Sequence, residues 1–165
     1  MAVSIFYYLT TDILKSTQNE SGYFEDGREK DFDTISIGTD DFPFVKTLLE
    51  DSANEIFEIL HKLTEDIEDA DGNELEPFVF DEEITDQEEN YISFTLQFPS
   101  NFNLKLTKPI NRAIRKCLIA KTILKWTEKK GRSIDKVILD EEKSCSKLKR
   151  LINLRKTLSK TYRWY

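Results

Sequence analysis

The stretch that decides the fold is Tyr91-Ile92-Ser93-Phe94-Thr95-Leu96-Gln97-Phe98. Its even-numbered residues are large and apolar, whereas its odd-numbered residues carry hydroxyl or amide groups. A period of two is typical of a β-strand with one buried face. We therefore predict a strand at Tyr91–Phe98 whose apolar side covers a hydrophobic core.

A partner strand is predicted just upstream, at Pro77–Asp81. The nine residues from Glu82 to Asn90 are mostly acidic, and we expect them to form a long loop that completes a β-hairpin. The carboxylates at this loop are candidate docking residues: Asp81, Glu82, Glu83, Glu88 and Glu89. Val3–Leu9 is rich in β-branched and aromatic residues and is predicted to be a further strand.

Three helices are predicted around the hairpin, at 42–66, 107–130 and 133–158, because apolar residues recur there at three- and four-residue steps. Gly131 is expected to end the second helix, so that the last two form an antiparallel αα-hairpin. Ser16–Asp33 is rich in glycine and charge and is expected to be a loop. Thr34–Ile37 is expected to be a short edge strand. The predicted class is α+β and mostly helical, with one domain at 1–158 and a C-terminal docking arm at 159–165.

The charge is divided unevenly along the chain. Residues 1–100 contain 26 Asp and Glu but 5 Lys and Arg, a net charge of −21, while residues 101–165 have a net charge of +14. If the two halves fold onto separate surfaces, the molecule has a large dipole and favours docking with copies of itself or with oppositely charged partners. This pattern favours an assembly protein over an enzyme.

Motifs for catalysis, cofactors and metals are missing from the sequence. It has no nucleophile elbow, phosphate-binding loop or dinucleotide fingerprint. The single histidine, His61, is expected to be an ordinary helix residue, and the acidic stretch Glu65–Glu76 lacks the first and last ligands of an EF-hand. The start of the chain lacks a basic leader, and no apolar run reaches membrane-spanning length. We therefore predict no catalytic residue, no cofactor, no metal and no membrane contact.

The two cysteines, Cys117 and Cys145, lie fourteen residues on either side of Gly131. Two helices packed around a turn there would place the thiols at similar heights. We expect two reduced thiols at the edge of the core, as is usual for a cytoplasmic protein, although a bridge is geometrically allowed.

The basic end of the chain has two interpretations. In one, its lysines and arginines bind nucleic acid, with the terminal aromatic residues stacking on bases. In the other, which we favour because the acidic half would repel DNA, they meet carboxylates of a neighbouring copy or partner. Tyr, Trp and Arg are enriched at interface hot spots, and the candidate docking residues are Arg155, Tyr162, Arg163, Trp164 and Tyr165.

The order of these parts resembles that of the small neck proteins of tailed phages and prophages, which join the head to the tail. The matching pieces cover most of the chain: Ile13-Leu14-Lys15-Ser16-Thr17, Gly22-Tyr23, Phe32-Asp33-Thr34-Ile35, Asp40-Asp41, Phe94-Thr95-Leu96-Gln97-Phe98-Pro99, Ala113-Ile114, Leu124-Lys125-Trp126, Asn153-Leu154-Arg155-Lys156 and Tyr162-Arg163-Trp164. None of them is a catalytic signature.

The resemblance implies a structural virion protein, assembled in the host cytoplasm, that forms a ring in the phage neck. Its partners would be copies of itself, the portal and other neck and tail proteins, with genomic DNA passing through the lumen. The alternative is a nucleic-acid-binding accessory protein that uses the basic C-terminal helix. A third hypothesis is a small phage or bacterial regulator that binds one host protein.

Overall fold

The computed structural model describes residues 2–24, 36–65, 67–69, 71–84, 89–132 and 134–154. Its elements follow in the order β1 (Ala2–Leu9), α1 (Thr10–Ser21), α2 (Phe42–Leu60), β2 (Phe78–Ile84), β3 (Glu89–Phe98), α3 (Thr107–Lys129) and α4 (Asp135–Asn153). The predicted α+β class is confirmed, with an N-terminal strand, a β-hairpin between α2 and α3, and a packed C-terminal helix pair.

The three strands form one antiparallel sheet in which β3 is central. The register of β1 against β3 runs from Ala2 opposite Phe98 to Leu9 opposite Tyr91. On the other side of β3, β2 pairs with it from Phe78 onward, and the register shifts at a β-bulge around Asp81. Both β1 and β2 are therefore edge strands among the described residues.

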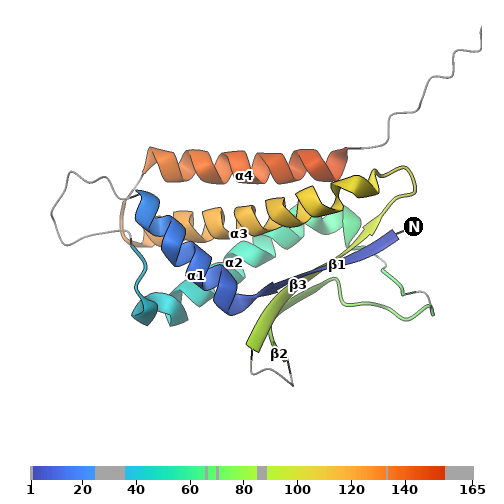
Figure 1. Ribbon diagram of the computed structural model, residues 1–165, viewed down its shortest axis with the longest axis horizontal. Coiled ribbons are helices and arrows are strands. Elements are labelled where there is room, and N and C mark those ends of the chain that lie inside the picture. Colours follow the sequence, from blue (N-terminus) through green and yellow to red (C-terminus); the bar gives the residue numbers. More distant parts are fainter. Residues whose placement is uncertain are drawn as a thin grey trace, which may run out of the picture.

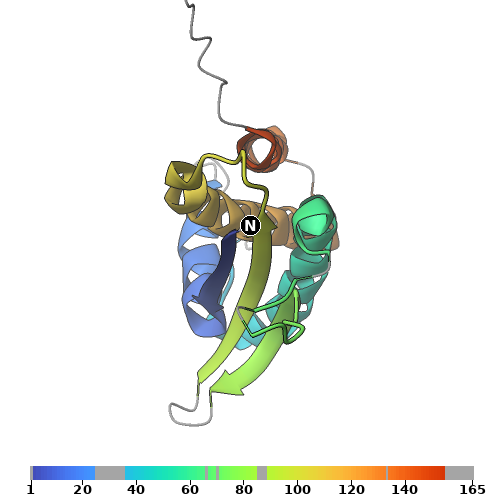
Figure 2. The same cartoon turned by 90° about the vertical axis from the view of Figure 1, so that its right-hand side faces the viewer.

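The helices cover one face of this sheet in two layers (Figure 1). Seen at 90° to that view, α1 and α2 lie on opposite sides of α3, and α4 lies beyond α3, away from the sheet (Figure 2). This arrangement makes α3 the central helix, packed against α1, α2 and α4. None of the helices in the described ranges has an apolar stretch long enough to cross a membrane.

The core forms where the apolar side of β3 meets α3. Ile92, Phe94, Leu96 and Phe98 of β3 are fully buried, as the alternation predicts. Aromatic stacking extends this core, because the ring centroids of Phe78 and Phe94 lie 5.2 Å apart on neighbouring strands. Eleven residues of α3 are buried, so this helix presents apolar side chains to neighbours on most of its circumference.

Helix α1 contradicts the prediction of a loop starting at Ser16, because α1 continues to Ser21. Its second half is polar, but the hydroxyls are satisfied locally: Thr17 Oγ1 donates to the Ile13 carbonyl at 2.8 Å, and Ser21 Oγ donates to the Gln18 carbonyl at 2.7 Å. Ser21 Oγ also accepts a hydrogen bond from the Ile37 amide at 3.2 Å. The hydroxyls thus bond to the helix and to a neighbouring segment.

Other boundaries differ by a few residues. Helix α2 ends at Leu60 and is followed by a 3-10 turn at His61–Leu63, earlier than the predicted end at 66. Ser36 and Ile37 belong to no strand, which contradicts the predicted edge strand for that part of it. Helix α3 ends where predicted: Gly131 has a φ of 69°, and its amide and that of Arg132 bond back to the carbonyls of Glu128 and Thr127.

The two cysteines are paired, which corrects the expectation of two reduced thiols. Cys117 of α3 and Cys145 of α4 form a disulfide, with their Cα atoms 5.2 Å apart. Both residues are buried. The bond ties α4 to α3, the helix against which α4 packs.

Candidate functional site

The acidic residues predicted for the hairpin loop lie mostly on its strands. Asp81, Glu82 and Glu83 belong to β2, and Glu89 belongs to β3. The prediction of a nine-residue loop is therefore wrong, because β2 and β3 continue pairing to Ile84 and Glu89. Glu88 lies outside the described residues. A strand position fixes the spacing of these carboxylates, which a loop would not do.

Asp81 occupies the bulge of β2 with a left-handed backbone, at a φ of 58°. Its carboxylate forms an ion pair with Lys46 of α2, and its carbonyl accepts a hydrogen bond from Asn90 Nδ2 at 3.2 Å. Non-glycine residues rarely adopt this conformation, although Asp and Asn tolerate it better than most. Asp81 is thus a residue that attaches the hairpin to α2, rather than a free docking carboxylate.

Glu82 and Glu83 are exposed on the same strand. The Tyr91 hydroxyl donates a hydrogen bond to Glu82 Oε2 at 2.7 Å. This bond favours the neutral phenol and raises the pKa of Tyr91 to about 12. The hairpin therefore presents carboxylates at defined positions, one of them held by a neighbouring side chain.

The acidic and basic halves are not fully separated in space. Glu55 of α2 accepts hydrogen bonds from Lys121 and Lys125 of α3. Lys121 also pairs with Glu141 of α4 at 2.9 Å. These four residues form a three-helix ion network in which charges from the two halves neutralise each other. An electrostatic docking surface therefore has to be formed by charged residues outside this network.

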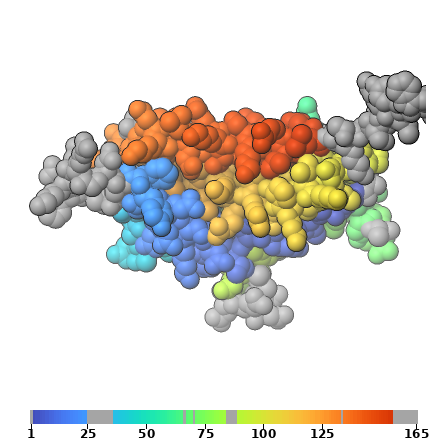
Figure 3. Space-filling view, turned by 45° about the horizontal axis from the view of Figure 1, so that its top comes forward, coloured from blue at the N-terminus to red at the C-terminus, as the bar shows by residue number. Residues whose placement is uncertain are grey.

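A basic surface remains on the other side of α3 and α4. The disulfide places Cys117 level with Cys145, so Arg112, five residues earlier, lies at the height of Arg150, five residues later. Figure 3 shows α4 above α3, with α1 beside them. The exposed lysines and arginines that define the basic surface are Lys108, Arg112, Lys116, Lys143, Lys147 and Arg150.

The charged groups near Glu20 of α1 show that the basic surface lies on the side of α3 and α4 that faces α1. Burial raises the pKa of Glu20, and the nearby Asp140 raises it further, while Lys116 and Arg115 act in the opposite direction. Asp140 of α4 and Lys116 of α3 therefore both lie near α1. Lys143 and Lys147 follow Asp140 by three and seven residues and share its helix face. The surface is thus continuous across the two helices.

The strand β1 was predicted at Val3–Leu9, but its position at an edge of the sheet, with apolar side chains exposed, was not. Val3, Ile5 and Tyr7 are exposed by 37%, 42% and 62%, although all three are large and hydrophobic. The signal was present in the sequence, since Ala2–Leu9 contains no charged residue. Only the strand order shows that this uncharged strand lies at an edge.

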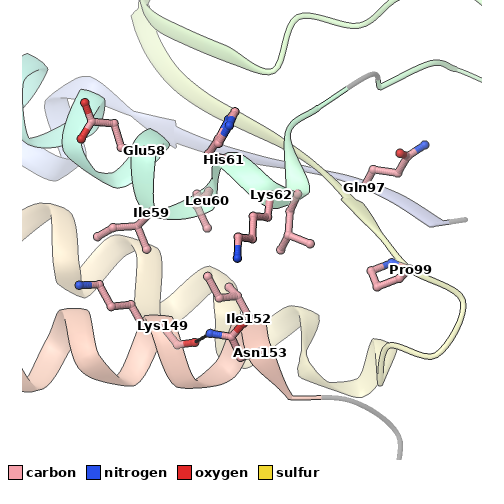
Figure 4. A pocket seen from close by; sticks show the side chains of 11 residues that line it. Glu58, Ile59, Leu60, His61, Lys62, Gln97, Pro99, Lys149, Ile152 and Asn153 are labelled. Atoms are coloured by element: carbon pink, nitrogen blue, oxygen red, sulfur yellow. Dashed lines mark hydrogen bonds between the residues drawn. The ribbon is translucent and has the colours of Figure 1, made fainter.

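Two cavities lie away from the predicted hairpin residues. One of about 460 Å³ lies between the ends of α2, β3 and α4, and its lining includes Leu60, Lys62, Lys149 and Ile152 (Figure 4). The other, of about 290 Å³, lies at the end of β1 and is lined by Tyr7, Tyr8, Leu9, Asp12, Ile13, Asn111 and Arg115. The Tyr8 hydroxyl donates to the Asn111 carbonyl at 3.1 Å, and burial raises the pKa of this phenol.

His61 and Asp69, which the sequence analysis considered as metal ligands, interact with residues close to them in the chain. His61 Nε2 lies 2.9 Å from Glu65 Oε1, one helical turn away. In the acidic stretch, Asp69 Oδ1 accepts hydrogen bonds from the amides of Asp71 and Asn73, and the side-chain bond from Asn73 is the largest cause of its lowered pKa. Within the described ranges, no three His, Cys, Asp or Glu side chains are gathered as metal ligands.

The predicted docking arm lies outside the described residues, which end at Leu154. Its candidate residues Arg155, Tyr162, Arg163, Trp164 and Tyr165 are therefore not placed. No known protein family matches the chain, and neither a curated protein nor a solved structure is significantly similar to it.

Proposed function

We propose that the chain is a structural, non-enzymatic subunit of a phage neck, which forms a ring joining the portal to the tail. The resemblance of the sequence to small neck proteins is the reason for assigning the chain to a phage neck. The observation that supports the proposal is the arrangement of charge on two opposite sides of the molecule. The β2–β3 hairpin, with Glu82, Glu83 and Glu89, projects from the sheet end, while the basic surface lies on α3 and α4 (Figure 1).

Opposite charges on opposite sides favour a head-to-tail contact between copies. Such a contact is heterologous, because two different surfaces meet, and it produces a ring when the rotation between subunits closes. A contact between two identical surfaces would instead place like charges together, which is unfavourable. Charge therefore supports a ring more than a two-fold dimer.

Negative-stain imaging and sedimentation velocity of the purified protein test the proposal. We expect closed rings with a central channel, which dissociate as salt screens the charges. Mixing with the products of neighbouring portal and tail genes should add density to one or both faces of the ring. A protein that stays monomeric at high concentration and low salt would contradict the proposed function.

The basic surface also supports the second candidate function, a nucleic-acid-binding accessory protein. Six exposed cations on two adjacent helices resemble the electrostatic footprint of such proteins. A filter-binding titration with duplex DNA separates the two functions. A steep loss of affinity with increasing salt, in a protein that forms no ring, would favour the nucleic-acid function.

A further inference from the structure

We infer that the sheet continues from one subunit to the next, with β1 of one copy pairing with β2 of its neighbour. This inference rests on the proposed ring and names the contact that would build it. Three observations carry it: the backbone groups at the outer edge of β1, the unequal protection of the two edges, and the charges beside each of them.

The hydrogen-bond pattern shows which amides of β1 face outward. The Thr95 amide donates to the Pro77 carbonyl at 2.9 Å, on the β2 side of β3. In an antiparallel sheet, the residue opposite Thr95 on the other neighbour then belongs to a non-hydrogen-bonded pair. That residue is Ile5. The backbone amide and carbonyl of Ile5 therefore point away from β3, and by the alternation of the strand so do those of Val3 and Tyr7.

The edge of β1 lacks the devices by which proteins protect such strands. It has no charged residue, no proline and no bulge over eight residues, and its outward amides belong to the same residues whose apolar side chains are exposed. The edge of β2 is protected only in its second half, by the bulge at Asp81 and the charged Glu82 and Glu83, so its uncharged first half, Phe78–Phe80, is the part that would pair with β1. An open, apolar edge strand is a site for adding another strand.

The charges beside the two edges are complementary. Arg115 lines the cleft at the end of β1, together with a single carboxylate, Asp12. Lys108 and Arg112 are exposed on the same half of α3. Across the sheet, β2 carries Glu82 and Glu83. A β2 strand added at β1 would bring carboxylates toward these cations.

The alternative pairings are less favourable for the same reason. Pairing β1 with β1 of a second copy would bring two cationic α3 segments together, and pairing β2 with β2 would juxtapose carboxylates. Only the pairing of unlike edges joins opposite charges. Both β1 and β2 run antiparallel to β3, so they run parallel to each other within one subunit. Rotation about an axis along the strands keeps the strand direction, so β1 of one subunit and β2 of the next would form a parallel pair.

The test uses full-length variants, each with one edge disabled. Ile5→Pro removes an outward amide from an edge strand, where proline is tolerated, and Val3→Pro does the same nearer the strand end. Ile5→Thr is the matched control, because it keeps the amide and the β-branched side chain. Glu82→Lys combined with Glu83→Lys reverses the charge of the β2 edge. Circular dichroism checks that each variant is folded.

We expect the proline variants and the double lysine variant to be monomeric alone, while Ile5→Thr assembles. A mixture of Ile5→Pro with the double lysine variant should form a heterodimer but no ring, because the intact β2 edge of the first can pair with the intact β1 edge of the second while the other two edges are disabled. The direct charge swap is therefore the decisive arm: the double lysine variant should co-assemble with Lys108→Glu/Arg112→Glu.

The outcomes test the β1–β2 pairing and the proposed ring as two separate hypotheses. Rings formed by folded Ile5→Pro and Val3→Pro would overturn the pairing and leave the proposed function standing. A dimer that survives in the double lysine variant but is lost in Ile5→Pro would show β1–β1 pairing and also overturn the inference. Open filaments of the wild-type protein that the proline variants abolish would support the pairing and contradict the ring. A wild-type monomer would contradict both.

Discussion

Lys121 Nζ of α3 lies 2.6 Å from Glu55 Oε2 of α2, and this ion pair joins the basic half of the chain to the acidic half. Lys121 is also paired with Glu141, and the side chains of these two residues are only 14% and 15% exposed. The network is therefore shielded from water more than a typical surface ion pair, and its loss should be measurable.

Replacing Lys121 with methionine should destabilise the protein by about 1–3 kcal/mol, because it leaves the largely buried carboxylate of Glu141 without its partner. Lys125→Met is the matched control, since Glu55 then keeps its bond to Lys121. We expect the control to cost less than Lys121→Met in urea denaturation. Equal losses in the two variants would contradict a central role for Lys121.

The same network predicts a dependence of stability on pH. Burial alone would raise the pKa of Glu55, but the hydrogen bonds from Lys121 and Lys125 outweigh it and hold the pKa below its usual value of about 4.5. A lowered carboxyl pKa stabilises the folded state above the usual pKa, and this contribution is lost as the pH falls. The difference in free energy of unfolding between wild type and Glu55→Gln should therefore shrink below pH about 4.5. A constant difference from pH 6 to 3 would refute the assignment.

The left-handed backbone at Asp81 can be separated from its ion pair by two substitutions. Asp81→Ala and Asp81→Gly both remove the carboxylate that pairs with Lys46. Glycine adopts a positive φ without steric cost, so Asp81→Gly should be about 1 kcal/mol more stable than Asp81→Ala. Thermal unfolding of the two variants measures this order, and the reverse order would exclude strain at the bulge.

The disulfide should make stability sensitive to reducing agents. Cys117 and Cys145 close a loop of sequence separation 28, for which the chain-entropy relation gives about 3–4 kcal/mol. Dithiothreitol should therefore lower the Tm of the wild-type protein. Cys145→Ala should have a lower Tm that does not respond to the reductant, and a response in this variant would point to another cause.

Deleting Tyr162–Tyr165 should abolish assembly while the subunit remains folded, because aromatic residues and arginine dominate interface energies. Size-exclusion chromatography with light scattering measures the assembly, and circular dichroism the fold. Removing the basic side chains alone, by Lys156→Ala and Lys160→Ala, is the control for a simple loss of charge. Unchanged assembly of the truncated chain would show that the arm does not dock.

The sequence predicts most of the elements because their periodicity is strong. The alternation at Tyr91–Phe98 gave the central strand, and the position of Gly131 gave the end of α3. Helix α1 was not predicted, because the hydroxyl and amide residues of its second half are typical of loops. In the structure, Thr17 and Ser21 bond to carbonyls of their own helix, and such local satisfaction does not appear in a periodicity pattern.

The candidate site was less predictable, because it depends on which elements become neighbours. The carboxylates of β2 were found from composition, but the attachment of Asp81 to Lys46 required the bulge and the packing of α2. The exposed edge of β1 follows from the strand order, since the same apolar sequence in a central strand would be buried on both sides. Hydrophobicity alone does not distinguish these two positions.

The bond between Cys117 and Cys145 gives this subunit two covalent forms, with consequences for when it becomes rigid. Cytoplasmic reductants keep such thiols reduced, whereas the medium outside a lysed cell oxidises them to a disulfide. If the subunit assembles in the host, α4 is then held by packing alone while the particle is built. Under the proposed function, oxidation after release from the host would then link α4 covalently to α3, so that the assembled particle would be more stable than its subunits were during assembly.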